Sequence, residues 1–383
     1  MTSRFHNAMW RACLFAVFLV PPVLADEFQD GLAAFNDKDY RTAMADWMPL
    51  ARSGDINAMY NVGLLYDEGL GVELDKRKAL DWYMGPAEEG DVSAQFNVAM
   101  IYDFGDGIAE DNEKAIYWYT KAARQADEEA QFNLAVMYAT GEGTAVDMDA
   151  AIHWYRLSAD LGHAPAQYNL ANIYDVGAFV PEDNQLAMQW YLKAAMQGDA
   201  DAQYAIALMY DDGDGFVEDD RLALKWYTVA AEQGSRDAQY TLALMLDEGM
   251  GVAEDNVAAV QWYEKAAEQG DPQAQNNLGA MYDAGEGIPV NDKQAVYWYT
   301  LAANQGNPIA QNNLGTMYFA GEGIKESKTD AYKWFYVAGE LGNDDARDNR
   351  DLAARGMRRS EVRKGKKLAL RWLKNFSLNA PIL

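Results

Sequence analysis

The stretch AQYAIALMYDDGDGFVEDDRLALKWYTVAAEQG at residues 202–234 decides the fold, because the chain repeats its pattern with a fixed spacing. Its aromatic pair returns every 36 residues, at Trp82-Tyr83, Trp118-Tyr119, Trp154-Tyr155, Trp190-Tyr191, Trp226-Tyr227, Trp262-Tyr263, Trp298-Tyr299 and Trp334-Phe335. A period of this length is typical of repeat arrays, in which each unit packs only on its neighbours. The 383 residues are therefore predicted to form one array instead of several globular domains.

The first half of each copy predicts a helix. Ala202, Ile206 and Tyr210 are four residues apart, which places them on one helical face. Gly213 follows, and glycine commonly takes the left-handed conformation that ends a helix. The eight copies begin at Ala58, Ala94, Ala130, Ala166, Ala202, Ala238, Ala274 and Ala310.

The second half of each copy predicts a second helix, which carries the Trp-Tyr pair. Ala223, Tyr227 and Ala231 form its apolar stripe. It opens on a residue type that caps helix N-termini, found at Asp75, Asp111, Asp147, Asp183, Asp219, Asp255, Asn291 and Ser327. The predicted fold is an all-α, right-handed α/α superhelical solenoid of repeated helix-turn-helix units.

The flanking segments predict capping elements. Residues 26–57 predict an N-terminal helical hairpin, and residues 58–345 hold the eight copies. Residues 346–383 leave the 36-residue phase but predict two basic closing helices. Its basic helix, at residues 358–374, has three open interpretations: a solvated cap, a surface that pairs with the acidic array of a second copy, or a contact for anionic polymers or lipid.

The N-terminal 25 residues predict an export signal. Arg4 and Arg11 precede an apolar run, and small residues end at a predicted cleavage site after Ala25. The run is about half the ~20 residues that a membrane span needs, so no transmembrane anchor is predicted. The predicted location is periplasmic or secreted. The only cysteine, Cys13, lies within this signal, so the mature chain is predicted to fold without disulfides.

The motif of the copies is most complete at Ala130-Gln131-Phe132-Asn133-Leu134, Tyr138, Gly141-Glu142-Gly143, Asp147, Ala151, Trp154-Tyr155 and Gly162. It resembles the Sel1-like repeat, a relative of the tetratricopeptide repeat. The resemblance implies an α-solenoid and adaptor roles, including periplasmic regulators of envelope sensor proteins and secreted host-interaction factors. Some family members are described as penicillin-binding or β-lactamase-like, but those are cysteine-rich, and this chain is not.

Composition and motifs favour no catalytic, cofactor or metal site. The formal net charge is -27, and no basic groove accompanies it over most of the chain, which argues against nucleic acid as a partner. His153 and His163 have no recurring acid or nucleophile set around them. The Gly-x-Gly loops lack the strand and lysine of a phosphate-binding loop, so we interpret them as turns. The acidic loop at residues 211–215 has two interpretations, a solvated loop and a weak calcium site.

The predicted partner-binding site is the non-core face of the first helices. Positions three, seven and ten of each copy share this face. In the first six copies they are Tyr60, Leu64, Asp67, Phe96, Met100, Asp103, Phe132, Val136, Ala139, Tyr168, Asn172, Asp175, Tyr204, Leu208, Asp211, Tyr240, Leu244 and Asp247, and the last two copies have Asn276, Ala280, Asp283, Asn312, Thr316 and Phe319. An aromatic-aliphatic floor with a row of carboxylates suits a net-basic or amphipathic peptide. The alternative is that the aromatics pack on a second helix.

Asparagine at position four of six copies needs a partner, because it is a poor residue in a helix interior. It is predicted to tie adjacent repeats together, with a bound peptide backbone as the alternative partner. The sequence thus predicts an exported, non-enzymatic scaffold that binds proteins or peptides. Two alternatives stay open, an enzyme acting on cell-wall or β-lactam substrates and a secreted host-interaction factor.

Overall fold

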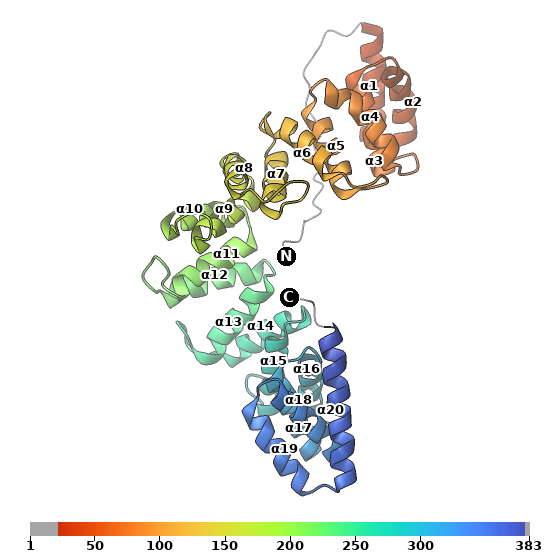
Figure 1. Ribbon diagram of the computed structural model, residues 1–383. Helices are drawn as coiled ribbons and strands as arrows, with labels where there is room; N and C mark the ends of the chain where they lie inside the picture. The colour runs from red at the N-terminus through yellow and green to blue at the C-terminus, as the bar shows by residue number, and fades with distance from the viewer. Residues whose placement is uncertain (1–21, 380–383) are drawn as a thin grey trace. The chain divides into compact units, whose positions relative to one another are not determined.

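The computed structural model describes residues 22–379, which hold twenty α-helices and no strand. Figure 1 shows the helices following one another in the order of the chain. The first twelve are α1 (Pro22–Asn36), α2 (Tyr40–Arg52), α3 (Ile56–Glu68), α4 (Lys76–Glu88), α5 (Val92–Phe104), α6 (Asn112–Ala123), α7 (Glu128–Thr140), α8 (Met148–Asp160), α9 (Ala164–Val176), α10 (Asn184–Ala195), α11 (Ala200–Asp211) and α12 (Asp220–Glu232). The remaining eight are α13 (Arg236–Glu248), α14 (Asn256–Glu268), α15 (Pro272–Ala284), α16 (Asp292–Asn304), α17 (Pro308–Ala320), α18 (Lys328–Glu340), α19 (Asp344–Arg355) and α20 (Arg359–Asn379).

The chain divides into two compact units, Met1–His163 and Ala164–Leu383. The first contains α1–α8 and the second α9–α20. Within each unit, consecutive helices pack together, first as a hairpin and then onto the next hairpin. The predicted all-α solenoid of helix-turn-helix units is confirmed. Most of the predicted export signal lies outside the described residues, and its last four residues belong to the start of α1.

Side-chain caps begin the helices where the sequence predicts. All eight cap residues of the second helices accept a hydrogen bond from a backbone N–H of the first turn, as Asp219 does from Leu222. First helices are capped in the same way, for example by Asp91 and Asp271. Such a cap is worth about 1 kcal/mol, and it recurs at nearly every helix start.

The Gly-x-Gly loops are turns, as predicted. Gly249 and Gly251 both have positive φ, at 71° and 66°, a region that glycine enters without steric cost. A side chain at Gly251 would meet Asp220, because a Cβ there would lie 2.5 Å from the Asp220 Cβ. The second glycine therefore lets the loop approach the second helix of the preceding repeat.

The core is built from alternating large and small side chains. Tyr263 of the Trp-Tyr pair is fully buried, and equivalent tyrosines pack above a small residue of the first helix. At Gly279 an added Cβ would lie 2.8 Å from the Tyr299 Cδ1. Tryptophan of the pair packs against clusters that span two repeats, as Trp262 does against the cluster that includes Tyr227 and Leu242. The pair is thus a packing element that joins repeats.

The closing helices correct one expectation from the sequence. Helix α19 keeps the 36-residue phase, with Ala346 fully buried at the first position and Asn343 as its cap. Arg347 takes the place of the recurring second-position glutamine, and its Nε donates to the Gly339 carbonyl oxygen at 3.2 Å. Helix α20 packs on α18 through Trp372, whose ring centre is 5.7 Å from that of Trp334. The phase ends one helix later than predicted.

Candidate partner-binding face

The third-position aromatics lie half-buried and contact the tyrosine of the second helix in their own repeat. The ring centres of Tyr240 and Tyr263 are 6.1 Å apart, and those of Tyr60 and Tyr83 are 5.4 Å apart. Phe96, Phe132, Tyr168 and Tyr204 repeat this contact. The rings therefore pack within the repeat, as the alternative interpretation held, and still leave part of their surface exposed.

The tenth-position carboxylates accept hydrogen bonds from the same buried tyrosines. Tyr227 Oη donates to Asp211 Oδ2 at 3.0 Å, and Tyr263 Oη donates to Asp247 Oδ2 at 3.2 Å. The pair recurs at Asp67, Asp103, Asp175 and Asp283 with Tyr83, Tyr119, Tyr191 and Tyr299. The carboxylate row is therefore part of the fold as well as part of the face.

Burial sets the protonation of these pairs. It raises the pKa of Asp247 above its usual value, while the hydrogen bond from Tyr263 opposes that shift. Burial and the charge of Asp211 raise the pKa of Tyr227, so its hydroxyl stays protonated and remains a donor. The pKa of Asp175 and of Asp283 is raised by burial in the same way. Asp175, Asp247 and Asp283 thus present carboxylates whose charge is costly to the folded chain and is attractive to a cation.

The seventh-position side chains complete the predicted face. Leu64, Met100, Val136, Leu208 and Leu244 are half-buried, and Asn172 is exposed. Asp103 differs from the other carboxylates, because only 5% of its surface is exposed. Ala139 replaces the aspartate in the third copy, so the row has a gap there. Within each unit the structure brings positions three, seven and ten onto one face.

Fourth-position asparagines tie adjacent repeats together, which confirms the favoured interpretation. Asn277 Nδ2 lies 3.1 Å from Tyr263 Oη, and Asn133 Nδ2 lies 3.3 Å from Tyr119 Oη. Asn97 Nδ2 reaches the hydroxyl of Tyr60, 37 positions earlier, at 3.4 Å. Aspartate, tyrosine and asparagine thereby form a polar line across one repeat and into the next.

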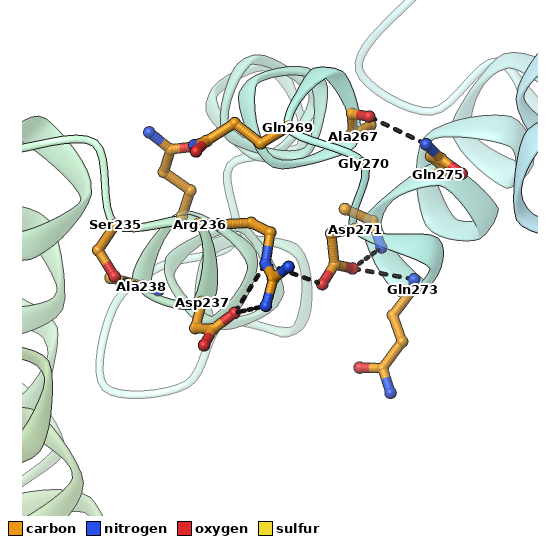
Figure 2. A network of polar contacts seen from close by, with 12 residues as sticks. Ser235, Arg236, Asp237, Ala238, Ala267, Gln269, Gly270, Asp271, Gln273 and Gln275 are labelled. Carbon is orange, nitrogen blue, oxygen red and sulfur yellow. Dashed lines mark hydrogen bonds and ion pairs between the residues drawn. The ribbon is translucent and has the colours of Figure 1, made fainter. Parts of the chain in front are cut away.

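A second polar network, based on second-position glutamines, was missed by the sequence reasoning. Gln275 is buried, and its Nε2 donates to the Ala267 carbonyl oxygen at 3.0 Å (Figure 2). Its Oε1 accepts from Gln305, which follows the second helix of the same repeat, at 2.8 Å. Gln95, Gln167 and Gln239 accept in the same way from a glutamine 30 positions later. The recurrence of glutamine at both positions was the available signal.

Three glutamines of this network have an unpaired buried oxygen. The Oε1 atoms of Gln131, Gln203 and Gln311 have no hydrogen-bond partner. Leu161 and Leu341 stand where Gln131 and Gln311 would find their donor glutamine. The link between the two glutamines is therefore formed at Gln95, Gln167, Gln239 and Gln275, and leucine replaces the donor at two of the three gaps. The Gln203 Oε1 is unpaired although Gln233 occupies the donor position.

The remaining candidates for chemistry have packing roles. The His163 ring centre lies 4.7 Å from that of Phe132, and the His153 ring lies 5.2 Å from Trp154. Among residues 22–379, no three His, Cys, Asp or Glu side chains are grouped so that they could hold a metal ion. Over the same part of the chain, no helix has the length and apolar character that crossing a membrane requires.

Comparison with known families agrees with this geometry. Eight segments match the Sel1 repeat, at residues 56–83, 92–127, 128–163, 164–199, 200–235, 236–271, 272–307 and 308–343. The chain belongs to the Sel1 repeat family. No curated protein matches the Sel1 repeat chain described here.

Two solved structures resemble this Sel1 repeat protein over most of its length. One is c5321 of uropathogenic Escherichia coli, a protective antigen with an SLR fold, at 29% identity and a TM-score of 0.63. That match covers 93% of this chain and 85% of the other. The second is a Sel1 repeat protein from Oxalobacter formigenes, at 32% identity and a TM-score of 0.63, covering 80% of this chain and 88% of the other. The fold is consistent with a protein-binding scaffold.

Proposed function

We propose that this Sel1 repeat protein is an exported, non-enzymatic scaffold that binds a net-basic or amphipathic peptide segment of a partner protein along its first helices. One observation carries the proposal. In six of the eight copies, this face of the first helix presents a half-exposed aromatic ring, and most of those six add an aliphatic side chain and a carboxylate. Repeat proteins use such extended faces for binding.

The charge of the array supports a basic partner. Residues 26–346 contain 19 basic and 56 acidic residues. In the second unit, partial burial removes some of the hydration of Asp175, Asp247 and Asp283, and it raises the pKa of each. A lysine or arginine on a peptide would compensate that loss, and such complementarity favours specificity and fast association.

Export rests on the N-terminal signal pattern and is supported by one relative. The Escherichia coli protein c5321 is a protective antigen. A chain of the same repeat type that carries an N-terminal export pattern fits an envelope or secreted location. The test is cell fractionation of the full-length chain with N-terminal sequencing of the product. A product that begins at Asp26 is expected, and a cytoplasmic product that retains residues 1–25 would overturn the export proposal.

The binding proposal is tested with arrayed peptides that differ in charge and apolar content. The variant D175N/D211N/D247N removes three charges and keeps an oxygen that accepts from each tyrosine hydroxyl. We expect basic amphipathic peptides to bind the natural chain and to bind this variant about tenfold less tightly, a difference of about 1.4 kcal/mol. The control E232Q/E264Q/E268Q removes three exposed charges from second helices. Equal weakening in both variants, or equal binding of acidic peptides, would contradict the proposal.

A further inference from the structure

The last repeat departs from the polar pattern at both partners of the carboxylate–tyrosine pair. Phe319 stands at the tenth position, where six of the other copies have aspartate, and Phe335 replaces the tyrosine of the second helix. Thr316 occupies the seventh position, where Leu208 and Leu244 stand in earlier copies. Phenylalanine thus replaces both the aspartate and the tyrosine of the pair, and threonine replaces a larger aliphatic side chain.

An apolar pocket lies at these exchanged positions. Its lining is Thr316, Phe319, Phe335, Asn349 and Leu352, around a hollow of about 200 Å³. Phe335 is 3% exposed, whereas Phe319 and Leu352 are 36% and 54% exposed. Ligand pockets for drug-sized molecules usually measure about 300–1,000 Å³, so this hollow matches a single side chain.

The pocket walls are held in place by the repeat packing. Asn349 Nδ2 of α19 donates to Asn312 Oδ1 of α17 at 2.9 Å, which ties the two helices that flank the hollow. Gly315 lies directly against Phe335, because an added Cβ would be 2.6 Å from the Phe335 Cε1. The pocket is therefore formed by the fold itself and needs no movement of α18 or α19.

Charge on the two sides of the pocket differs. On the side of the preceding repeats, Asp283 and Asp247 occupy the tenth positions of α15 and α13. On the other side, Arg355 follows Leu352 by about one helical turn in α19. A peptide whose apolar side chain entered the pocket would meet carboxylates in one direction and Arg355 in the other.

The repeat spacing sets where cationic residues would be needed. Adjacent first helices are linked side chain to side chain, as by Asn313 Nδ2 to Asn276 Oδ1 at 3.2 Å. Packed helices lie about 8–10 Å apart, and an extended peptide rises about 3.3 Å per residue. One repeat therefore corresponds to about three peptide residues.

We propose that this pocket seats one large apolar side chain of an extended partner peptide whose lysine or arginine residues lie about three and about six positions from that anchor. The basic residues would pair with Asp283 and Asp247. The proposal rests on the proposed function and adds to it the place of the anchor and the direction of the charged segment.

The test measures fluorescence anisotropy of labelled peptides with the full chain. One probe has leucine followed by lysine at the third and sixth positions, and a second has the same residues in reverse order. We expect one of the two to bind, and replacement of its leucine by alanine to weaken binding by about tenfold or more. A probe with lysines at the first and second positions should bind less tightly, because both charges would lie within one repeat.

Two variants separate the pocket from the carboxylate row. F319D/F335Y rebuilds the pair that six earlier repeats carry, and T316L introduces the leucine of other copies. Both are expected to fold and to bind leucine and alanine probes equally. Y297S, at a ring that is 53% exposed outside the pocket lining, is the control and should bind as the natural chain does.

Each other outcome decides against the pocket. If both pocket variants bind the leucine probe like the natural chain while D175N/D211N/D247N binds it weakly, the scaffold proposal stands and the anchor proposal fails. If neither probe binds although arrayed basic peptides do, the anchor proposal also fails alone. If no basic peptide binds at all, both proposals fail. Self-association that T316L abolishes would assign the pocket to a second copy and overturn the peptide anchor.

Discussion

The middle repeat at residues 236–271 and the last repeat at 308–343 share their helix lengths, caps and Gly-x-Gly loops but differ at the face. In the middle repeat, Tyr263 joins Asp247 to Asn277 through its hydroxyl. In the last repeat, Phe335 has no hydroxyl, and the same region is an apolar hollow. The difference teaches that packing and surface chemistry are separable, because the ring fills the core in both repeats.

The largest expected effect comes from deleting the shared ring. Tyr263→Ala and Phe335→Ala should each cost about 3–5 kcal/mol, because each removes a buried aromatic side chain. Because the repeats of an array can unfold separately, a local measurement is needed. Amide hydrogen exchange in α13 and α17, the first helices of the two repeats, reports the local loss of stability. Tyr297→Ala, at a 53% exposed ring, should change stability by about 0.5 kcal/mol or less. A large loss in only one of the two repeats would break the comparison.

Moving the polar pair into the last repeat is the next test. Phe335→Tyr alone should cost about 1–3 kcal/mol, since its hydroxyl would be buried beside Phe319 with no carboxylate to accept it. Adding Phe319→Asp should recover about 1 kcal/mol or more, measured as the coupling energy of a double-mutant cycle. Tyr263→Phe in the middle repeat supplies the reverse change. Additive effects of the two substitutions would show that ring and carboxylate do not interact.

The glutamine network offers a smaller effect at the same end of the chain. Gln311 Oε1 is buried and unpaired, and Leu341 occupies the position of the missing donor. Leu341→Gln supplies a hydrogen bond of about 1 kcal/mol but removes apolar packing, so thermal stability should change little. Leu161→Gln makes the same repair beside Gln131 at a side chain that is 51% exposed, and it should stabilise by about 1 kcal/mol. A loss of stability in Leu161→Gln would refute the assigned donor.

The smallest effect is a pH dependence. Burial raises the folded-state pKa of Asp247, so ionising this carboxyl destabilises the folded chain. The free energy of unfolding therefore falls as pH rises above the usual pKa of 3.8. Asp247→Asn should therefore raise the melting temperature at pH 7 by about 1 °C, and the gain should shrink towards pH 4. The hydrogen bonds from Lys114 lower the pKa of exposed Asp111, so Asp111→Asn should act in the opposite direction. Equal responses of the two variants would contradict the assigned environments.

The local and periodic features followed from the sequence by itself. The phase of the Trp-Tyr pair, the eight caps of the second helices and the turn glycines depend on interactions within a few residues or on a repeat that any copy reveals. The same periodicity defines the candidate binding face as the set of positions that share one side of the first helices, and binding there stays a prediction. Helical periodicity is enough for these assignments, because it assigns residues to faces.

Only the tertiary structure decided which hydrogen-bond partners the side chains of that face have. The sequence placed Asp247 in a row of carboxylates but indicated no partner for it, and in the structure it accepts a hydrogen bond from the hydroxyl of Tyr263, which lies 16 positions later on another helix. Other features also depend on contacts between different helices. They are the glutamine links, the repeat phase that α19 keeps, and the packing of α20 on α18. Periodicity tells which side of a helix a residue occupies and not which neighbour covers it. That choice depends on how the neighbouring helices pack, and it decides where the face is polar and where a pocket opens.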